Sequence, residues 1–396
     1  MPTFKAFKKN SGKKSRRKKI KTCLFFDKYI GKLNYEKSEN QKGGKAIMYG
    51  SIGCVFSPAI SCKTKKLSDS EKNRYISKLM LHDEAKREIE KVNLIKNRLT
   101  ILKPIYRKYL PILSTYLCNK PDITKSDLEN IEICKNVKGM QNIKKYDVKL
   151  FKHFSILNML NSGEDLFEYR KNNSFARTTS TKLVNNFLLK CIDFFVECIF
   201  VLNKNNIYHF DIKIENITYN KRENCLSLID FGRAIISNND SIKQNGIQNI
   251  ALDFNILPQI LLLYDDTSFF ECEIEMQEYI KTKYDNSING EIALNEYSNI
   301  LRINKNNIIR IFAKILYKIY INYRLDLIEN KNAYFHDIFK WNVDIWSMLL
   351  VLNTMFSGTV YSNDIKNIAK DFFEKSFQNK VDYDTIQNQL NALIKK

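Results

Sequence analysis

Two carboxylates and two neighbouring polar side chains are the part of this sequence best suited to chemistry. Asp211 is followed closely by Lys213 and Asn216, and Asp230 lies a short distance further on. Such an Asp can orient a hydroxyl group and accept its proton, such a Lys can steady a phosphoryl group, and an Asn and a second Asp can hold Mg against the phosphates of ATP. The pattern predicts a phosphotransferase, with catalytic residues Asp211, Lys213 and Asn216 and metal ligands Asn216 and Asp230.

The flanking residues predict the elements that position this site. Apolar residues recur at helical spacing from Phe187 to Phe200, which predicts a buried helix leading into the loop that carries Asp211. After the loop, residues 217–219 and 226–229 are typical of two short strands joined by a polar turn. This hairpin would return Asp230 towards Asn216.

With these residues, the sequence resembles the eukaryotic-type serine/threonine protein kinases. Residues 209–211 read His-Phe-Asp where that family's catalytic loop reads His-Arg-Asp, and residues 230–232 match its Asp-Phe-Gly metal-binding triplet. The order Asp-Ile-Lys at residues 211–213 resembles the branch of this family that modifies Ser and Thr. The resemblance implies an α+β, two-lobed protein-kinase-like fold, with a small antiparallel-sheet N-lobe plus one helix and a larger, mainly helical C-lobe.

The resemblance extends to segments that would bind ATP. Residues 48–55 resemble the glycine-rich loop, although Met48 replaces its first Gly. Lys78, on a predicted strand over 74–80, stands where the family has its phosphate-binding Lys. The predicted helix over 83–99 offers Glu84, Glu88 and Glu90 as partners for that Lys, and Glu88 is favoured because apolar residues flank it on the buried face.

A further segment, residues 154–166, resembles the strand and hinge between the two kinase lobes. Leu157 would be the gatekeeper, residues 158–160 would present backbone groups to adenine, and Glu164 would lie near the ribose. The whole set of nucleotide-binding residues implied by the resemblance is Gly50, Ser51, Gly53, Val55, Lys78, Glu88, Leu157, Met159 and Glu164.

Near the C-terminus, residues 343–348 resemble the family's Asp-x-Trp-Ser segment, whose Asp supports the catalytic loop. Because a buried carboxylate without partners is costly, Asp344 is expected to accept hydrogen bonds from backbone amides.

Two departures from the family pattern concern regulation. Phe210 replaces the Arg that pairs with a phosphorylated activation segment, so switching by that route is not expected. Gln259 stands for the Glu of the family's Ala-Pro-Glu marker, and Lys380 is the nearest candidate for its cationic partner.

The predicted organisation has three parts. Residues 1–45 form a basic extension, residues 46–160 the N-lobe with the hinge, and residues 161–396 the C-lobe with an insertion at about 260–340. The extension has ten basic residues between Lys5 and Lys21 and no acid among them, within a chain of net charge +21, so we expect it to be disordered. It is a solvated tail, a nuclear-targeting tract, a tether with weak polyanion or nucleic-acid contact, or a tether to an acidic partner.

Composition sets further expectations. No apolar run approaches the roughly 18 to 20 residues needed to cross a bilayer, which predicts a soluble, intracellular protein of the cytoplasm or nucleus without a membrane span. The nine Cys lack Cys-x-x-Cys spacing and form no metal cluster with the four His, so reduced thiols are expected. His209 is expected to brace the catalytic loop. An apolar helix over 308–320 is predicted to be part of the core.

Three functions are compatible with these features. The leading one is a protein serine/threonine kinase that uses ATP with Mg or Mn and acts on Ser/Thr hydroxyls of protein substrates. A pseudokinase scaffold is suggested by Met48, Phe210 and Gln259, and a small-molecule phosphotransferase would share the catalytic loop but would not need Asp344. The pattern with insertions is also similar to kinases encoded by large DNA viruses, which would place the protein in a host cell or virion.

Overall fold

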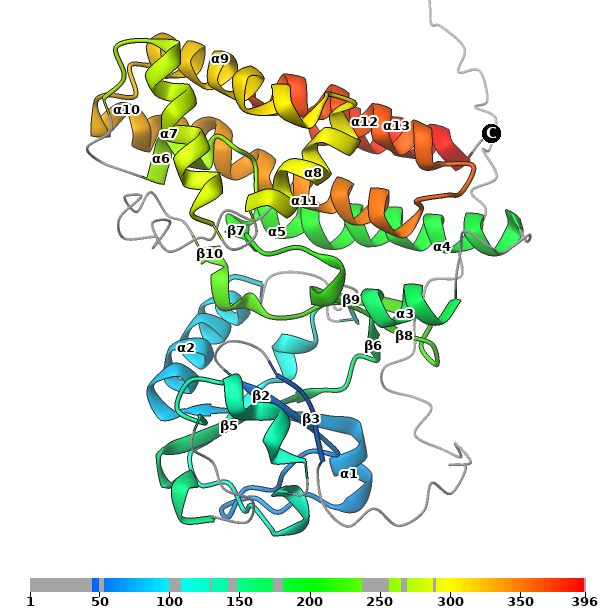
Figure 1. The fold of residues 1–396 in the computed structure, drawn as a ribbon. Coiled ribbons are helices and arrows are strands. Elements are labelled where there is room, and N and C mark those ends of the chain that lie inside the picture. The colour runs from blue at the N-terminus through cyan, green and yellow to red at the C-terminus, as the bar shows by residue number, and fades with distance from the viewer. Residues whose placement is uncertain are drawn as a thin grey trace, which may run out of the picture. The chain divides into compact units, whose positions relative to one another are not determined.

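The computed structural model describes residues 45–49, 53–99, 108–128, 130–141, 148–173, 181–236, 256–264, 269–287 and 290–394. Over these ranges the protein is α+β, with a small antiparallel sheet followed by a mostly helical region (Figure 1). Residues 1–44 of the predicted basic extension lie outside the described residues, as do Gly50 and Ser51, whereas Lys45 is the first residue of β1. Among the described residues no helix is both long and apolar enough to cross a membrane.

The sheet has five antiparallel strands in the order β1-β2-β3-β5-β4. Alternation of side chains between its faces places Phe56, Leu79 and Ile156 in a small core. The strands are β1 Lys45–Tyr49, β2 Cys54–Ser57, β3 Tyr75–Leu81, β4 Tyr116–Cys118 and β5 Phe154–Leu160. Helix α1, Asp69–Arg74, precedes β3, and helix α2, His82–Leu99, follows it, close to the range predicted.

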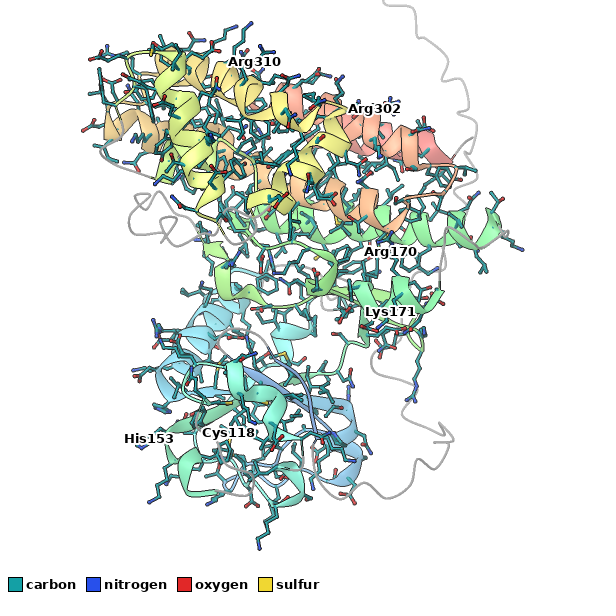
Figure 2. All side chains as sticks on the ribbon, in the orientation of Figure 1. Cys118, His153, Arg170, Lys171, Arg302 and Arg310 are labelled. Carbon is teal, nitrogen blue, oxygen red and sulfur yellow. A yellow bond between two sulfur atoms is a disulfide. The ribbon has the colours of Figure 1, made fainter. Side chains whose placement is uncertain are left out.

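Two disulfides cross-link this sheet region, and they correct the expectation of reduced thiols. Cys54 of β2 bonds to Cys134, and Cys62 bonds to Cys118 of β4, whose position is labelled in Figure 2. The partners are 80 and 56 residues apart, so no local spacing could reveal them. The free thiols among the described residues are Cys191, Cys198, Cys225 and Cys272.

The helical region begins with the elements that frame the predicted catalytic loop. A continuous helix runs over α4 Thr181–Phe194, a π-helical turn Phe195–Ile199 and α5 Phe200–Lys204, and it is followed by strand β7, Ile207–Tyr208. The predicted hairpin is present as β8 Ile217–Asn220 and β9 Cys225–Leu228. The remaining short elements are β6 Glu164–Asp165 beside β8, α3 Leu166–Asn173, and β10 Ile235–Ile236 beside β7.

The rest of the chain forms a helical assembly around α11, Lys340–Met355, of which nearly every residue is buried. In Figure 1, α11 runs between the α4–α5 helix and the layer of α8 and α9. The helices are α6 Ile260–Tyr264, α7 Glu273–Asp285, α8 Gly290–Leu301, α9 Lys305–Tyr323, α10 Ile328–Tyr334 with a π-helical turn Phe335–Phe339, α12 Ser362–Ser376 and α13 Tyr383–Ile394.

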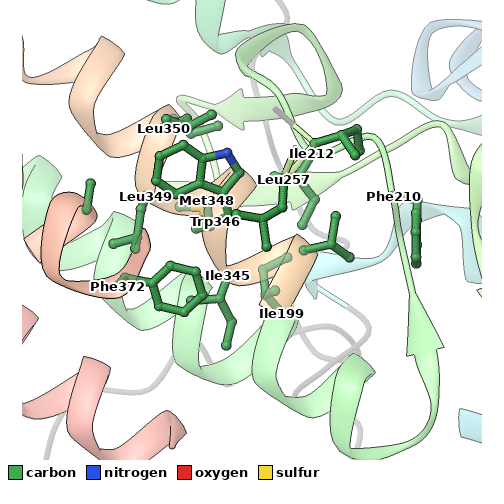
Figure 3. Packing of buried hydrophobic residues seen from close by; sticks show 14 of the residues in the cluster. Ile199, Phe210, Ile212, Leu257, Ile345, Trp346, Met348, Leu349, Leu350 and Phe372 are labelled. Carbon is green, nitrogen blue, oxygen red and sulfur yellow. The ribbon is translucent and has the colours of Figure 1, made fainter. Parts of the chain in front are cut away.

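The helices of the predicted insertion belong to this core. Tyr297 of α8 stacks on Trp346 of α11, with ring centroids 5.7 Å apart, and Phe312 of α9 is fully buried beside Tyr297. Figure 3 shows Trp346 among buried residues of several elements, including Leu257 and Phe372. The prediction that the apolar helix over 308–320 forms part of the core is confirmed.

Candidate active site

A buried carboxylate in α11 fixes the loop that carries Asp211. The Oδ2 atom of Asp344 accepts a hydrogen bond from the backbone N–H of His209 at 2.7 Å, and its Oδ1 accepts one from Phe210 at 2.9 Å. Burial raises the pKa of Asp344 to about 7, while these two hydrogen bonds act in the opposite direction. Phe210 has a φ of 61°, an unfavourable conformation for a bulky residue, which these contacts hold in place. The predicted support of the loop by Asp344 is confirmed.

His209 links this loop to the segment of Asp230. Its ring is fully buried, with Nε2 3.0 Å from the carbonyl oxygen of Ile229 and the ring centroid 4.7 Å from that of Phe231. Burial lowers the pKa of His209, which favours a neutral imidazole. These contacts are those of the structural brace predicted from the sequence.

The three predicted catalytic residues lie together. The side-chain amide of Asn216 donates to the backbone oxygen of Asp211 at 2.8 Å and to its Oδ2 at 2.9 Å. Lys213 Nζ lies 3.2 Å from the same Oδ2. On the other side of the carboxylate, Arg233 Nη1 lies 3.4 Å from Oδ1. Arg233 was not predicted from the sequence, where its only signal is its position directly after the Asp-Phe-Gly triplet.

Asp230 is brought to the same place by the hairpin. The N–H of Ile229 donates to the backbone oxygen of Asn216 at 3.0 Å, so the next residue, Asp230, lies beside Asn216. Its side chain is 43% exposed. The main influence on the pKa of Asp230 is the positive charge of the nearby Lys78 ammonium, which lowers it. Its carboxylate is therefore kept ionised, as a ligand of a hard cation must be.

The described residues contain no group of three or more His, Cys, Asp or Glu placed to bind a metal ion. The two predicted ligands are instead one carboxylate and one amide. Mg is commonly held by one or two protein oxygens together with water and substrate phosphates, so Asp230 and the amide oxygen of Asn216 fit that ion.

Lys78 connects the sheet region to Asp230. Its Nζ lies 3.0 and 2.8 Å from the two carboxylate oxygens of Glu88 and 3.7 Å from Oδ1 of Asp230. Burial acts to lower the pKa of Lys78, but the two carboxylates outweigh it and raise that pKa above its ordinary value. Of the three Glu considered, Glu88 is thus the partner, as favoured, whereas Glu84 pairs with Lys138 at 3.0 Å.

A second lysine of α2, not identified from the sequence, holds the Asp-Phe-Gly segment. Lys91 Nζ donates to the backbone oxygen of Gly232 at 2.7 Å. Burial lowers the pKa of Lys91. Since Glu88 and Lys91 lie on one helix, α2 contacts both the phosphate-binding candidate Lys78 and the segment that begins with Asp230.

A small pocket adjoins this ion pair. It lies between α2, β5 and residues 229–231, and its lining includes Glu88, Val92, Thr115, Met159 and Asp230. Of the other predicted nucleotide-binding residues, Gly53 abuts Lys78, because a Cβ there would lie 3.0 Å from Lys78 Cγ. Val55 pairs with Lys78 across the β2–β3 ladder.

The predicted strand and hinge segment, residues 154–166, contains the end of β5. Leu160 pairs with Tyr75 in the β3–β5 ladder, so the chain leaves the sheet at residues 161–163. Gly163, with φ of 98°, makes the turn there. Met159 lines the pocket, whereas Leu157 is buried with Met80 and Ala85.

The positions of the remaining predicted residues are as follows. Glu164 lies in β6, with Oε1 2.6 Å from Lys221 Nζ. Gln259 is fully buried, but Lys380 does not reach it as a partner: its Nζ lies 3.3 Å from the centre of the Trp341 ring. Phe210 packs near Phe335 and Phe339, so an aromatic cluster occupies its surroundings.

Comparison with known proteins gives no independent assignment: no family model matches the chain, and no curated protein matches it. The functional conclusion therefore depends on the arrangement of these side chains.

Proposed function

We propose that this protein is a serine/threonine protein kinase that transfers the γ-phosphate of ATP to hydroxyl groups of protein substrates. The observation that carries the proposal is the chain of contacts from Glu88 through Lys78 to Asp230, which stands beside Asn216 and Asp211. In this arrangement, Lys78 is the cation for the phosphates, and Asn216 and Asp230 are the oxygen ligands for a metal ion. Asp211 is the carboxylate for the acceptor hydroxyl. The α+β architecture, with a small antiparallel sheet before a helical region, supports a two-lobed protein-kinase-like fold.

In this mechanism, Asp211 orients the substrate hydroxyl and accepts its proton as the oxygen attacks the γ-phosphorus. The new O–P bond forms, the bond to the bridging oxygen of ATP breaks, and ADP leaves with the electron pair. Lys213, which contacts Asp211, stabilises charge on the transferred group, and Lys78 orients the other phosphates. Bound Mg, held by Asn216 and Asp230, would supply further neutralisation of phosphate charge.

The support for Asp211 favours a protein kinase over a small-molecule phosphotransferase. Asp344 lies in the buried helix α11 and holds the amides of both His209 and Phe210. In the resemblance to kinases, this Asp is a feature of protein kinases rather than of small-molecule kinases that share the catalytic loop. Because Asp211 is held without a phosphate-binding Arg at position 210, we expect activity that does not require phosphorylation of the segment after β10.

The test is transfer of labelled phosphate from ATP with Mg or Mn to a basic and an acidic generic protein, followed by phosphoamino-acid analysis. Wild type is expected to make phosphoserine or phosphothreonine. Asp211→Asn should reduce transfer by about 10²- to 10⁴-fold while leaving ATP binding intact, because it removes only the proton acceptor. Asp230→Ala should abolish metal-dependent transfer.

The matched control is Asp384→Asn, which changes an exposed Asp in the first turn of α13 and should leave transfer unchanged. Absence of transfer by wild type that still binds ATP with metal would reject the kinase and favour a scaffold. Transfer that survives in Asp211→Asn would remove this residue from the mechanism.

A further inference from the structure

Phe210 combines an unfavourable backbone conformation with a fully buried ring. Its φ of 61° lies in the left-handed region, which a bulky side chain rarely adopts. The ring is fully buried, and its centroid lies 6.3 Å from that of Phe335 and 6.1 Å from that of Phe339. Because Asp211 is the next residue, the contacts that hold residue 210 in this conformation also determine where the Asp211 carboxylate lies.

The two neighbouring rings come from a single turn of the chain. Phe335 and Phe339 are the first and last residues of the π-helical turn between α10 and α11. Both are fully buried, and their ring centroids are 6.1 Å apart. π-helical turns are rare and often lie at functional sites. Here such a turn, at the end of the predicted insertion, packs against the residue that precedes Asp211.

One continuous helical segment therefore holds residue 210 in two ways. α10, the π-helical turn and α11 follow one another without interruption over residues 328–355. Asp344 accepts a hydrogen bond from the N–H of Phe210 at 2.9 Å, which restrains the backbone. Phe335 and Phe339 pack against the ring of Phe210, which restrains the side chain. The two restraints together fix the orientation of the residue.

We propose that Phe210 is a positioning residue for Asp211 and that it acts through its packing against Phe335 and Phe339. This inference rests on the proposed kinase function. In the resemblance to kinases, an Arg stands at position 210 and acts through its charge on a phosphorylated segment. A buried phenyl ring acts through apolar packing instead. Ion pairs are screened by salt, whereas apolar packing needs neither a phosphate nor a counter-charge.

A purely space-filling role for these rings is the alternative. In that case, loss of a ring leaves a cavity and lowers the stability of the whole protein, but molecules that remain folded react at the normal rate. A positioning role changes the rate of the folded molecules themselves, because misplacing a reacting group by about 1 Å can cost about 10²-fold in rate. The two roles are distinguished by kcat per folded site.

The experiment measures kcat and the KM for ATP with the full-length protein, Mg and the generic protein substrate that wild type phosphorylates. ATP-binding sites are counted by calorimetric titration, and kcat is expressed per site. Phe335→Leu and Phe339→Leu each remove one ring and leave residue 210 unchanged. Each should lower kcat by about tenfold while changing the KM for ATP by less than about twofold, because the misplaced group is Asp211 and not the nucleotide-binding residues.

Two further variants separate positioning from stability. The matched control is Phe372→Leu, at a ring that is also fully buried but lies on α12, apart from Phe210 in Figure 3. This change should lower the melting temperature to a similar extent and leave kcat per site unchanged. Phe335→Tyr keeps a ring at the contact and should retain most of the wild-type kcat.

A double variant tests whether the rings act through their contact. Phe210→Leu alone should lower kcat per site, as Phe335→Leu does. The variant with both changes should lose less than the product of the two single effects, because either change alone already removes the contact. Losses that multiply would show that the two rings act independently and would overturn the proposed packing.

The remaining outcomes separate the inference from the function on which it rests. Unchanged kcat per site in both Phe335→Leu and Phe339→Leu, or an equal loss in Phe372→Leu, overturns the positioning role while leaving the kinase intact. A rise in the KM for ATP that matches the fall in kcat also overturns it, because the change would then concern nucleotide binding. Failure of wild type to phosphorylate any protein, with ATP binding retained, overturns the kinase function and the inference together.

Discussion

The sheet region, residues 45–160, has a small apolar core around Phe56 and Leu79 and is cross-linked by two disulfides. The helical region, residues 161–394, has a continuous core around α11 and keeps three buried cysteines as free thiols among its described residues. A small body buries less of its surface than a large one, so covalent links contribute more to its stability. The loop that carries Asp211 is therefore held by a residue of a large packed core, whereas the strands beside Lys78 depend partly on cross-links.

The largest effect should come from the core of the helical region. Trp346→Ala removes a fully buried ring that stacks on Tyr297, and we expect a loss of about 3–5 kcal/mol in the free energy of unfolding. Denaturant titration followed by circular dichroism measures it. Trp341→Ala, at a partly buried Trp, is the matched control and should cost less. Equal losses would show that the full burial of Trp346 does not set the size of the effect.

An intermediate effect is expected from the sheet region. The double change Cys54→Ala with Cys134→Ala removes one cross-link and should lower the free energy of unfolding by about 2–4 kcal/mol. Hydrogen exchange resolved by peptide should locate the loss in residues 53–160. Cys191→Ala is the control, because it removes a buried thiol of the helical region without breaking a cross-link. If exchange increases equally in both regions, the contrast between them is wrong.

The smallest effect concerns the contact between the two regions. Lys91→Met removes the hydrogen bond to Gly232 and should weaken metal-dependent ATP binding by about fivefold, corresponding to roughly 1 kcal/mol for one hydrogen bond. Calorimetric titration with ATP and Mg measures it. Lys86→Met, at an exposed position of the same helix, controls for lost charge. Unchanged affinity in Lys91→Met would mean that this contact does not position Asp230.

The sequence was sufficient to predict the contacts of residues whose surroundings are set by nearby residues in the chain. Glu88 was chosen correctly because apolar residues mark the buried face beside it and Glu84 lies too near the helix start, and Asp344 because a buried helical carboxylate requires amide partners. The ion pair of Arg233 with Asp211 was missed because a chain with 64 Lys and Arg residues gives one arginine no special signal. The contact forms because the turn after Asp230 places the Arg233 side chain beside Oδ1 of Asp211.

Pairing between distant segments determined the features that the sequence did not specify. The end of β5 depends on how far β3 extends beside it, and the ladder continues to Leu160 and Tyr75. The cross-link between Cys54 and Cys134 likewise depends on contacts made across 80 residues. Local composition contains little information about either feature.

The stacking of Tyr297 on Trp346 bears on how this protein can be shortened. Trp346 lies two residues after Asp344, and Asp344 holds the amides beside Asp211. A ring contact, a two-residue step along α11 and the hydrogen bonds of Asp344 therefore connect α8 to the loop that carries Asp211. A trimmed protein without α7–α9 would expose the aromatic face of α11 to water beside that support. A shortened protein that keeps the Asp211 loop in place therefore has to retain the predicted insertion, although the resemblance to kinases gives it no chemical role.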